Sequence, residues 1–174
     1  MPSYLLAGEP AQAGSRRVWD LLILDHLRLK AWDRILFVEC GDGWIVEEAW
    51  RRAGRAYVYG LDMSGEDVAL AKRIREVPGK VEFETWDGRA LPVPAGSFDR
   101  AVAIVVASRV AAAALVRDLG RVLSGDGDAY LLHSAGADAD IHRELAQPGW
   151  AEVRELARCG DETALVWATR CATP

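Results

Sequence analysis

Short apolar runs alternate with helix-like segments through most of this chain, and that alternation limits the fold more than any other feature. The run RILFVE at 34–39 is apolar through its centre, which is typical of a strand buried on both faces of a sheet. The strand-like segments are 34–39, 56–62, 80–86, 98–107 and 129–134, and the helix-like segments are 44–54, 64–77 and 109–123. Strands separated in this way predict an α/β fold in which helices cover both faces of a parallel sheet.

The two ends of the chain add elements to this alternating core. The tail contains a short helix that Pro148 ends, followed by two strand-like segments whose glycine-containing connection is typical of a hairpin. The run SGDGD at 124–128 predicts a turn before the last parallel strand. We expect a single domain over 1–174, made of a flexible arm at 1–14, a leading helix at 15–32, a core at 33–134, and a short lid helix with a closing hairpin at 135–174.

Charge and cysteine content exclude several classes of protein. The 174 residues carry a net charge of −5, whereas proteins that coat nucleic acid need a basic surface. Cys40, Cys159 and Cys171 form no close pair, so we expect reduced thiols and no metal site. No run reaches the roughly 18 apolar residues of a membrane span, and the first residues lack the pattern of a signal peptide. These features favour a cytoplasmic protein.

The segment ECGDG at 39–43 joins a predicted strand to a predicted helix. Gly41 and Gly43 can adopt the positive φ that other residues avoid, and the first free N–H groups of a helix attract anionic groups. Val46 stands where a dinucleotide-binding loop would have its third glycine, and an ordinary tight turn explains the two glycines equally well. Asp62 ends the next strand, where an acid can accept both hydroxyls of a ribose or can simply favour the start of a helix.

A more specific pattern follows the third predicted strand. The segment DGRALPVPAGSFDRAV at 87–102 combines an acid, a small residue, a Leu-Pro-x-Pro turn and Ser-Phe-Asp. This order resembles class I S-adenosylmethionine-dependent methyltransferases, notably the type-11 group, over about residues 30–134. The segment LVRDLGRVLSGDGDAYLLH at 115–133 resembles the same family, although GDGD stands where the family has Pro-Gly-Gly. The resemblance implies a Rossmann-like, doubly wound, mostly parallel sheet closed by an antiparallel hairpin, in three α/β/α layers.

The resemblance also implies a role for each matching position. S-adenosylmethionine would be the cofactor, with its ribose hydroxyls on Asp62 and its adenine against Met63. Asp87 would accept from the adenine amino group, and the backbone of Gly88 would meet a ring nitrogen. The methionine part of the cofactor would contact the loop and the end of the fourth strand, through Glu39, Cys40, Gly41, Gly43, Ile104 and Val105.

Two positions depart from the family's pattern. The first strand of the family usually ends in an acid, an apolar residue and Gly-x-Gly-x-Gly; here Phe37 replaces the acid and Glu39 replaces the first glycine. Glu39 either supplies the missing carboxylate to the ammonium of the cofactor or fills the place of the cofactor. A buried carboxylate without a partner costs several kcal/mol or changes its pKa, so Glu39 needs a cation, a donor or water in either case.

Little in the sequence identifies catalytic groups or the substrate. His133, at the end of the fifth predicted strand, is the best candidate for a general base, although a single histidine there is more often structural. The segment between the last parallel strand and the hairpin, 135–149, is short for a lid. It is consistent with an open cleft or with a partner chain or second copy that completes the lid.

Three functions remain open on the sequence alone. The first is S-adenosylmethionine-dependent methyl transfer to an unidentified acceptor, and the second is a non-catalytic member of the same fold that acts as a scaffold or regulatory partner. The third is a nicotinamide-dependent dehydrogenase, against which Val46 and the 87–99 segment both count.

Overall fold

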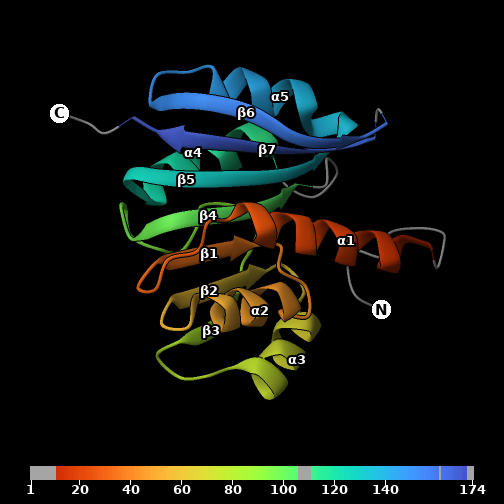
Figure 1. The fold of residues 1–174 in the computed structure, drawn as a ribbon, viewed down its shortest axis with the longest axis vertical. Coiled ribbons are helices and arrows are strands. Elements are labelled where there is room, and N and C mark those ends of the chain that lie inside the picture. The colour runs from red at the N-terminus through yellow and green to blue at the C-terminus, as the bar shows by residue number, and fades with distance from the viewer. Residues whose placement is uncertain (1–10, 106–110, 161, 172–174) are drawn as a thin grey trace.

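A seven-stranded mixed sheet forms the centre of the protein (Figure 1). The computed structural model describes residues 11–105, 111–160 and 162–171. The strand order is β3-β2-β1-β4-β5-β7-β6; the first five strands are parallel, β7 is antiparallel to β5, and β6 is antiparallel to β7. The expected doubly wound α/β architecture with a closing antiparallel hairpin is confirmed.

The strands and helices follow one another in the order that the sequence predicts. The strands are β1 (Arg34–Val38), β2 (Tyr57–Asp62), β3 (Val81–Thr85), β4 (Phe98–Val105), β5 (Leu123–Ser134), β6 (Trp150–Cys159) and β7 (Thr163–Arg170). The helices are α1 (Ala11–His26), α2 (Trp44–Ala53), α3 (Gly65–Arg75), α4 (Ala112–Val122) and α5 (Ala135–Leu145). No helix in these described ranges is long and apolar enough to cross a membrane.

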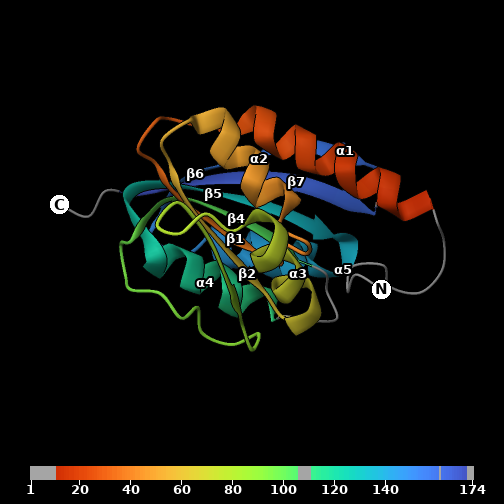
Figure 2. The ribbon, with the colours of Figure 1, turned by 90° about the horizontal axis from the view of Figure 1, so that it is seen from below.

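Each face of the sheet carries its own apolar core. Helices α1, α2 and α3 pack on one face and α4 and α5 on the other, as the view along the sheet shows (Figure 2). Side chains alternate along β1, so Leu36 belongs to the α4–α5 core while Ile35 and Phe37 belong to the α1–α3 core. Phe37 is 1% exposed, and burying such a ring stabilises the fold by about 1.5–3 kcal/mol. The position where the family has an acid is therefore a core position here.

The leading helix differs from its predicted bounds. It runs from Ala11 to His26 rather than over 15–32, so residues 11–14 of the expected arm are helical, and residues 1–10 lie outside the described part of the chain. The helix cannot continue to residue 32 because Arg28 and Trp32 have φ of 45° and 84°, outside the helical region. The apolar pattern alone did not contain this information.

The predicted turn at 124–128 is instead part of β5. Strand β5 pairs Leu123 with Phe98 and Asp128 with Arg100, so the glycine-rich run bulges between two paired positions. A Cβ on Gly127 would lie 3.1 Å from the Asp99 carbonyl oxygen, which explains why glycine stands at this close approach. The prediction of a turn was wrong because the pairing on both sides of the bulge is set by β4, far away in the sequence.

The carboxyl ends of the parallel strands meet at one edge of the sheet. Val38 lies beside Leu61 of β2 and beside Ala103 of β4. Further along the same edge, Val105 lies beside His133. The expected end of the fourth strand and the expected start of the following helix fall in 106–110, outside the described residues. This edge is where an open α/β sheet binds its ligands.

Candidate functional site

The glycine loop between β1 and α2 takes a left-handed backbone at three positions. Glu39, Gly41 and Gly43 have φ of 60°, 59° and 74°. The Cys40 N–H donates to the Leu61 carbonyl at 3.1 Å, and the Gly43 N–H donates to the Cys40 carbonyl at 3.2 Å. A left-handed backbone costs a non-glycine residue about 1–2 kcal/mol. The loop keeps its left-handed geometry at Glu39 in spite of this cost.

Asp62 connects this loop to the next helix. Asp62 is 1% exposed; one carboxylate oxygen accepts the Gly41 N–H at 2.7 Å and the other accepts the Ser64 N–H at 2.8 Å. Hydrogen bonds to a carboxylate are roughly twice as strong as neutral ones. The acid that the sequence assigns to a ribose is thus also a structural brace between the glycine loop and the start of α3.

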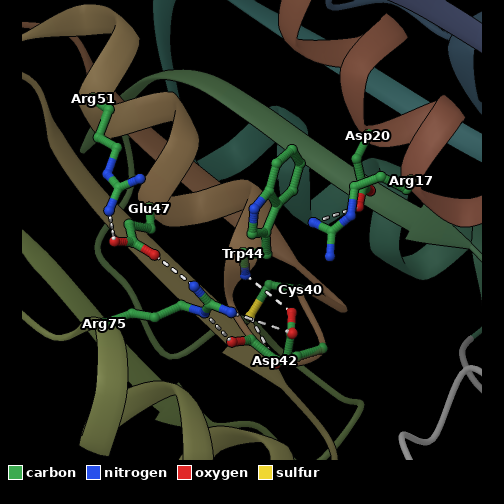
Figure 3. Close-up of polar contacts among 9 residues, drawn as sticks. Arg17, Asp20, Cys40, Asp42, Trp44, Glu47, Arg51 and Arg75 are labelled. Carbon is green, nitrogen blue, oxygen red and sulfur yellow. Dashed lines mark hydrogen bonds and ion pairs between the residues drawn. The ribbon is translucent and has the colours of Figure 1, made fainter.

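A second set of polar contacts holds the loop from the side of α3. The Arg75 Nε donates to the Asp42 carbonyl at 2.8 Å, and its Nη1 donates to the Glu47 carboxylate at 2.5 Å (Figure 3). The Asp42 carboxylate accepts the Trp44 N–H at 3.1 Å, at the start of α2. Sequence reasoning missed this clamp, because its partners are 28 and 33 residues apart and no local pattern links them.

Helix α1 contributes charged groups beside the same loop. The Arg17 guanidinium lies 3.6 Å from the centroid of the Trp44 ring, a stacked cation–π contact (Figure 3). The Asp20 carboxylate pairs with Arg16 at 2.7 Å, and burial raises the pKa of Asp20. Burial, and next the charge of Asp62, raises the pKa of the Cys40 thiol, which makes Cys40 a neutral core residue at neutral pH.

Gly43 has a packing role in addition to its conformation. A Cβ on Gly43 would lie 2.5 Å from Cε1 of the Phe83 ring, and a Cβ on Gly60 would lie 2.7 Å from Cδ1 of the same ring. Phe83 is 3% exposed in the α1–α3 core. The two glycines leave room for this ring, so the glycine at position 43 serves the core as well as the loop.

The residues expected to meet the adenine lie after β2 and β3. Met63 is half-buried against the α4–α5 core. Asp87 is exposed and accepts the Arg89 N–H at 2.9 Å, and Gly88 has a φ of 81°. Gly88 also lines a cavity of about 530 Å³ between this turn and α4, together with Arg89, Ala90, Ala111, Ala114, Leu115, Arg117, Asp118 and Arg121. The backbone at Gly88 is therefore open to a neighbouring group.

The remaining predicted site residues lie at the ends of β4 and β5. Ile104 is 6% exposed and packs in the α1–α3 core, and Val105 pairs with His133. The His133 ring is buried against α5, with its Nε2 3.6 Å from the Asp138 carboxylate, and burial lowers the pKa of its imidazole. His133 is therefore not exposed to a substrate from solvent in this structure, and its role as a base stays a prediction.

A glycine loop of this geometry, at the carboxyl edge of a sheet ordered 3-2-1-4-5-7-6, is typical of proteins that bind a nucleoside-containing cofactor. Residues 35–127 match the sequence profile of a family described as a methyltransferase domain. The match covers more than half of the chain, so the chain belongs to this family of methyltransferase domains. The cofactor of the family is S-adenosylmethionine, as the sequence predicts. A comparison with curated protein sequences finds no match.

Solved structures with the same fold include proteins of different activity. A chain from the complex of the Haloferax volcanii Trm112 methyltransferase activator with a methyltransferase aligns with a TM-score of 0.72 at 15% identity, over 92% of this chain and 93% of the other. Geranyl diphosphate C-methyltransferase from Streptomyces coelicolor A3(2) gives 0.71 at 13% identity, over 91% and 79%. The [4+2]-cyclase SpnF gives 0.72 at 17% identity, over 94% and 83%. At sequence identities this low, the structural similarity establishes the fold alone, and a fold alone does not determine which reaction a protein catalyses.

Among the described residues, the features that best suit S-adenosylmethionine are backbone positions in the glycine loop and at Gly88. The left-handed conformations of Gly41 and Gly43 give the loop the shape that allows a ligand to approach the backbone closely, directly before the N-terminus of α2. Gly88 adds an open backbone position on the adenine side. Glu39 is the one loop residue that departs from the expected pattern, and it is 7% exposed.

Proposed function

We propose that the protein transfers a methyl group from S-adenosylmethionine to an acceptor that remains to be identified. The observation that carries this proposal is the glycine loop, which keeps three left-handed residues in a family of methyltransferase domains although one of them is Glu39. Asp62 holds Gly41 in this conformation through a buried charge-assisted hydrogen bond. The family membership also favours this function over a nicotinamide-dependent dehydrogenase.

The proposed cofactor contacts follow the positions assigned from the sequence. The ribose would be held at Asp62, the adenine at Met63, Asp87 and Gly88, and the methionine part by the loop residues with Ile104 and Val105. When bound, S-adenosylmethionine supplies a methyl group that its sulfonium already activates. The protein then contributes mainly orientation and exclusion of water. Holding the reactants together lowers the activation free energy by up to about 7–11 kcal/mol in favourable cases.

Glu39 has a specific role in this proposal. Phe37 belongs to the apolar core, so the carboxylate that the family places there is missing, and Glu39 is the buried acid two residues further on. We assign Glu39 to the ammonium group of the cofactor, because it is the acid next to the position that Phe37 leaves without a carboxylate, and a nearby cation favours the ionised form of an acid. This assignment makes Glu39 a ligand rather than an obstacle.

Titration of the purified chain with S-adenosylhomocysteine, followed by calorimetry and thermal unfolding, tests the proposal. Ligand at 100 times its Kd stabilises a folded protein by about 2.7 kcal/mol. Glu39→Gln should raise the Kd more than tenfold, and Glu39→Gly should weaken binding too. Glu48→Gln, at a partly exposed residue of α2 that pairs with Arg52, makes the same chemical change and should leave the Kd unchanged. Absence of heat and thermal shift at millimolar ligand refutes cofactor binding, and tighter binding by Glu39→Gly refutes the role of Glu39 alone.

One observation favours a second candidate, a non-catalytic member of the fold. Both oxygens of the Asp62 carboxylate accept backbone N–H groups, so the loop is already braced without any ligand. A scaffold needs such a rigid loop and no turnover. Incubation with radiolabelled S-adenosylmethionine and cell extract separates the two candidates: a labelled product supports the enzyme, and cofactor binding without any product supports the scaffold.

Association with a second chain is also part of the proposal. Helix α5 is the only helix between β5 and β6 among the described residues, and β6 is an exposed edge strand. One structure with this fold contains the Trm112 activator, which supports the idea that a partner chain or a second copy completes the lid.

The three free cysteines favour a cytoplasmic location, where thiols stay reduced.

A further inference from the structure

A cluster of two histidines and one aspartate lies at the carboxyl end of β5, and the proposed methyl transfer uses neither its carboxylate nor its second imidazole. His133 is the next-to-last residue of β5, while Asp138 and His142 lie four residues apart on α5. Four-residue spacing puts two side chains on the same face of a helix. One ligand-type atom from each of the three side chains lies within 4.8 Å of the others.

The protonation of His133 follows from its hydrogen bonding. Its Nδ1 lies 3.2 Å from the Ser134 carbonyl oxygen. A carbonyl can only accept, so Nδ1 carries the proton and the Nε2 nitrogen presents a lone pair. A hydrogen bond on one ring nitrogen that fixes the other as a free lone pair is the usual arrangement of a metal-binding histidine.

That lone pair is buried and faces a carboxylate. The His133 side chain is 1% exposed, its Nε2 has no hydrogen-bond partner among the described residues, and the nearest carboxylate oxygen, on Asp138, is 3.6 Å away. Two electron-rich groups repel each other at this distance, and a buried polar atom without a partner costs about 1–3 kcal/mol. A cation between the two groups removes both penalties.

The spacing of the three side chains suits one metal ion. The Asp138 oxygen is 3.6 Å from His133 Nε2 and 3.6 Å from His142 Nδ1. Tetrahedral coordination with bonds of ~2.0–2.1 Å places neighbouring ligand atoms ~3.3–3.4 Å apart. The His142 Nδ1 also lies 3.0 Å from the Asp138 carbonyl oxygen, so by the argument given for His133 it carries a proton in this structure. His142 is 44% exposed, so its ring can turn away from that carbonyl and present a nitrogen lone pair to the ion with little disturbance of the core.

We propose that His133, Asp138 and His142 bind a divalent transition-metal ion, with zinc the best match. Imidazole and carboxylate ligands select zinc and its neighbours over magnesium, which prefers oxygen ligands alone. Three protein ligands leave a fourth position for water, as in zinc sites that act on a substrate. The site lies at the same edge of the sheet as the glycine loop, since His133 pairs with Val105 of β4.

Arg158 of β6 competes for the same carboxylate. Its Nη2 lies 3.3 Å from the Asp138 oxygen and 2.6 Å from the Glu155 carboxylate. The guanidinium therefore supplies a positive charge to Asp138 when no ion is bound, and Glu155 retains it when the ion replaces it. A fixed positive charge beside a metal ion lowers its affinity, so loss of Arg158 strengthens the site.

Calorimetric titration of the chelator-treated full chain with Zn²⁺, Mn²⁺ and Mg²⁺ tests the proposal. We expect one Zn²⁺ per chain, weaker Mn²⁺ binding and no Mg²⁺ binding. Asp138→Asn and His142→Ala, both at partly exposed side chains, should each raise the Zn²⁺ Kd at least tenfold. Asp140→Asn is the matched control, because Asp140 lies on the same helix and pairs with Arg143 outside the cluster.

Two further variants make the outcome decisive. Arg158→Gln should lower the Zn²⁺ Kd several-fold, because it removes the competing charge. Cys159→Ser should have no effect, although Cys159 is an exposed thiol next to Arg158 in the sequence. Absence of Zn²⁺ binding at micromolar protein, or binding that survives both Asp138→Asn and His142→Ala, overturns the proposal. The readout is metal binding, so it stays independent of any methyltransferase activity.

Discussion

The acidic groups of the glycine-loop region and of the β5–α5 region differ in how closely the protein surrounds them with partners. Asp62, at the end of β2, accepts two backbone N–H groups at 2.7 and 2.8 Å, so this acid is satisfied before any ligand arrives. The nearest charged or ionisable groups to the Asp138 carboxylate lie at 3.3, 3.6 and 3.6 Å. The first region is preorganised by the protein itself, whereas the second has ligand-type groups that a bound cation would complete.

The two regions depend on the core beneath them to different degrees. Gly43 of the glycine loop lies against the ring of Phe83, and Arg75 holds the loop through the Asp42 carbonyl. The histidine cluster depends on one buried ring, His133, with its two other members on an exposed helix face. Substitutions in the loop should therefore cost folding stability, while those on α5 should cost mainly ion binding.

The largest expected effect breaks the packing of the glycine loop. Gly43→Ala adds the strain of a left-handed alanine, about 1–2 kcal/mol, to an overlap with the Phe83 ring, about 1–3 kcal/mol. We expect a loss near 3 kcal/mol in the free energy of unfolding, measured by urea denaturation. Gly79→Ala is the matched control, since its φ of 72° is close to that of Gly43 and nothing lies within 4 Å of the added carbon.

A second background identifies the source of that loss. In Phe83→Leu the ring atoms that overlap are gone, so Gly43→Ala should then cost no more than Gly79→Ala does. If Gly43→Ala and Gly79→Ala cost the same in the unmodified chain, the loop does not rest on Phe83.

A smaller effect sharpens the role of the clamp. Arg75 and Arg51 both bind Glu47, but the Arg75 side chain is 16% exposed and also binds the loop at Asp42, whereas Arg51 is 61% exposed. Arg75→Ala should lower the free energy of unfolding by about 1–3 kcal/mol, because it removes the Arg75 donor from two partly buried acceptors, the Asp42 carbonyl and the second Glu47 oxygen. Arg51→Ala should cost less than about 0.5 kcal/mol, as exposed pairs do.

Urea unfolding and titration with S-adenosylhomocysteine measure both consequences of the clamp. Arg75→Ala should weaken ligand binding along with stability, since Asp42 belongs to the loop, and Arg51→Ala should change neither. A loss of stability with unchanged ligand affinity places the clamp in the fold alone.

The sequence predicted the parts of the molecule that depend on local patterns. Continuous apolar runs identify the parallel strands, because strands buried on both faces need no polar alternation. The paired glycines of the loop identify the first strand–helix junction. At the start of α3 the signal is equally local, because the Ser64 hydroxyl accepts the Asp67 N–H three residues on. These features are encoded within a few neighbouring residues.

Features set by distant partners were not predictable in this way. The bulge in β5 depends on the register with β4, and the clamp joins Arg75 to residues 28 and 33 positions earlier. Only two of the three members of the histidine cluster could be placed together from the sequence. Asp138 and His142 share a helix face by their spacing, but only the folded chain brings β5 and its His133 against that face.

The smallest expected effect concerns the pH dependence of stability in the half of the sheet that carries the glycine loop. The Tyr57 hydroxyl donates to the Glu82 carboxylate at 2.6 Å and the Gly79 N–H donates at 2.9 Å; these contacts, the Tyr57 bond first, lower the pKa of Glu82. The unfolded chain then binds a proton to Glu82 at higher pH than the folded chain does. The stabilisation is complete above the ordinary pKa of 4.5 and is lost as the pH falls through the lower, folded value.

Glu82→Gln should therefore flatten this part of the stability profile, measured by urea unfolding at closely spaced pH values between 3 and 6. The wild-type chain should exceed the variant in stability most clearly above pH 5, and the difference should shrink toward pH 3. Solvent screens this partly exposed pair, so the difference should be the smallest of the three. Glu66→Gln removes an exposed acid at the start of α3 and none of these hydrogen bonds. If both variants show the same pH profile, the Tyr57 and Gly79 contacts do not hold Glu82 ionised. Glu82 is then not fixed by its hydrogen bonds in the way that Asp62 is.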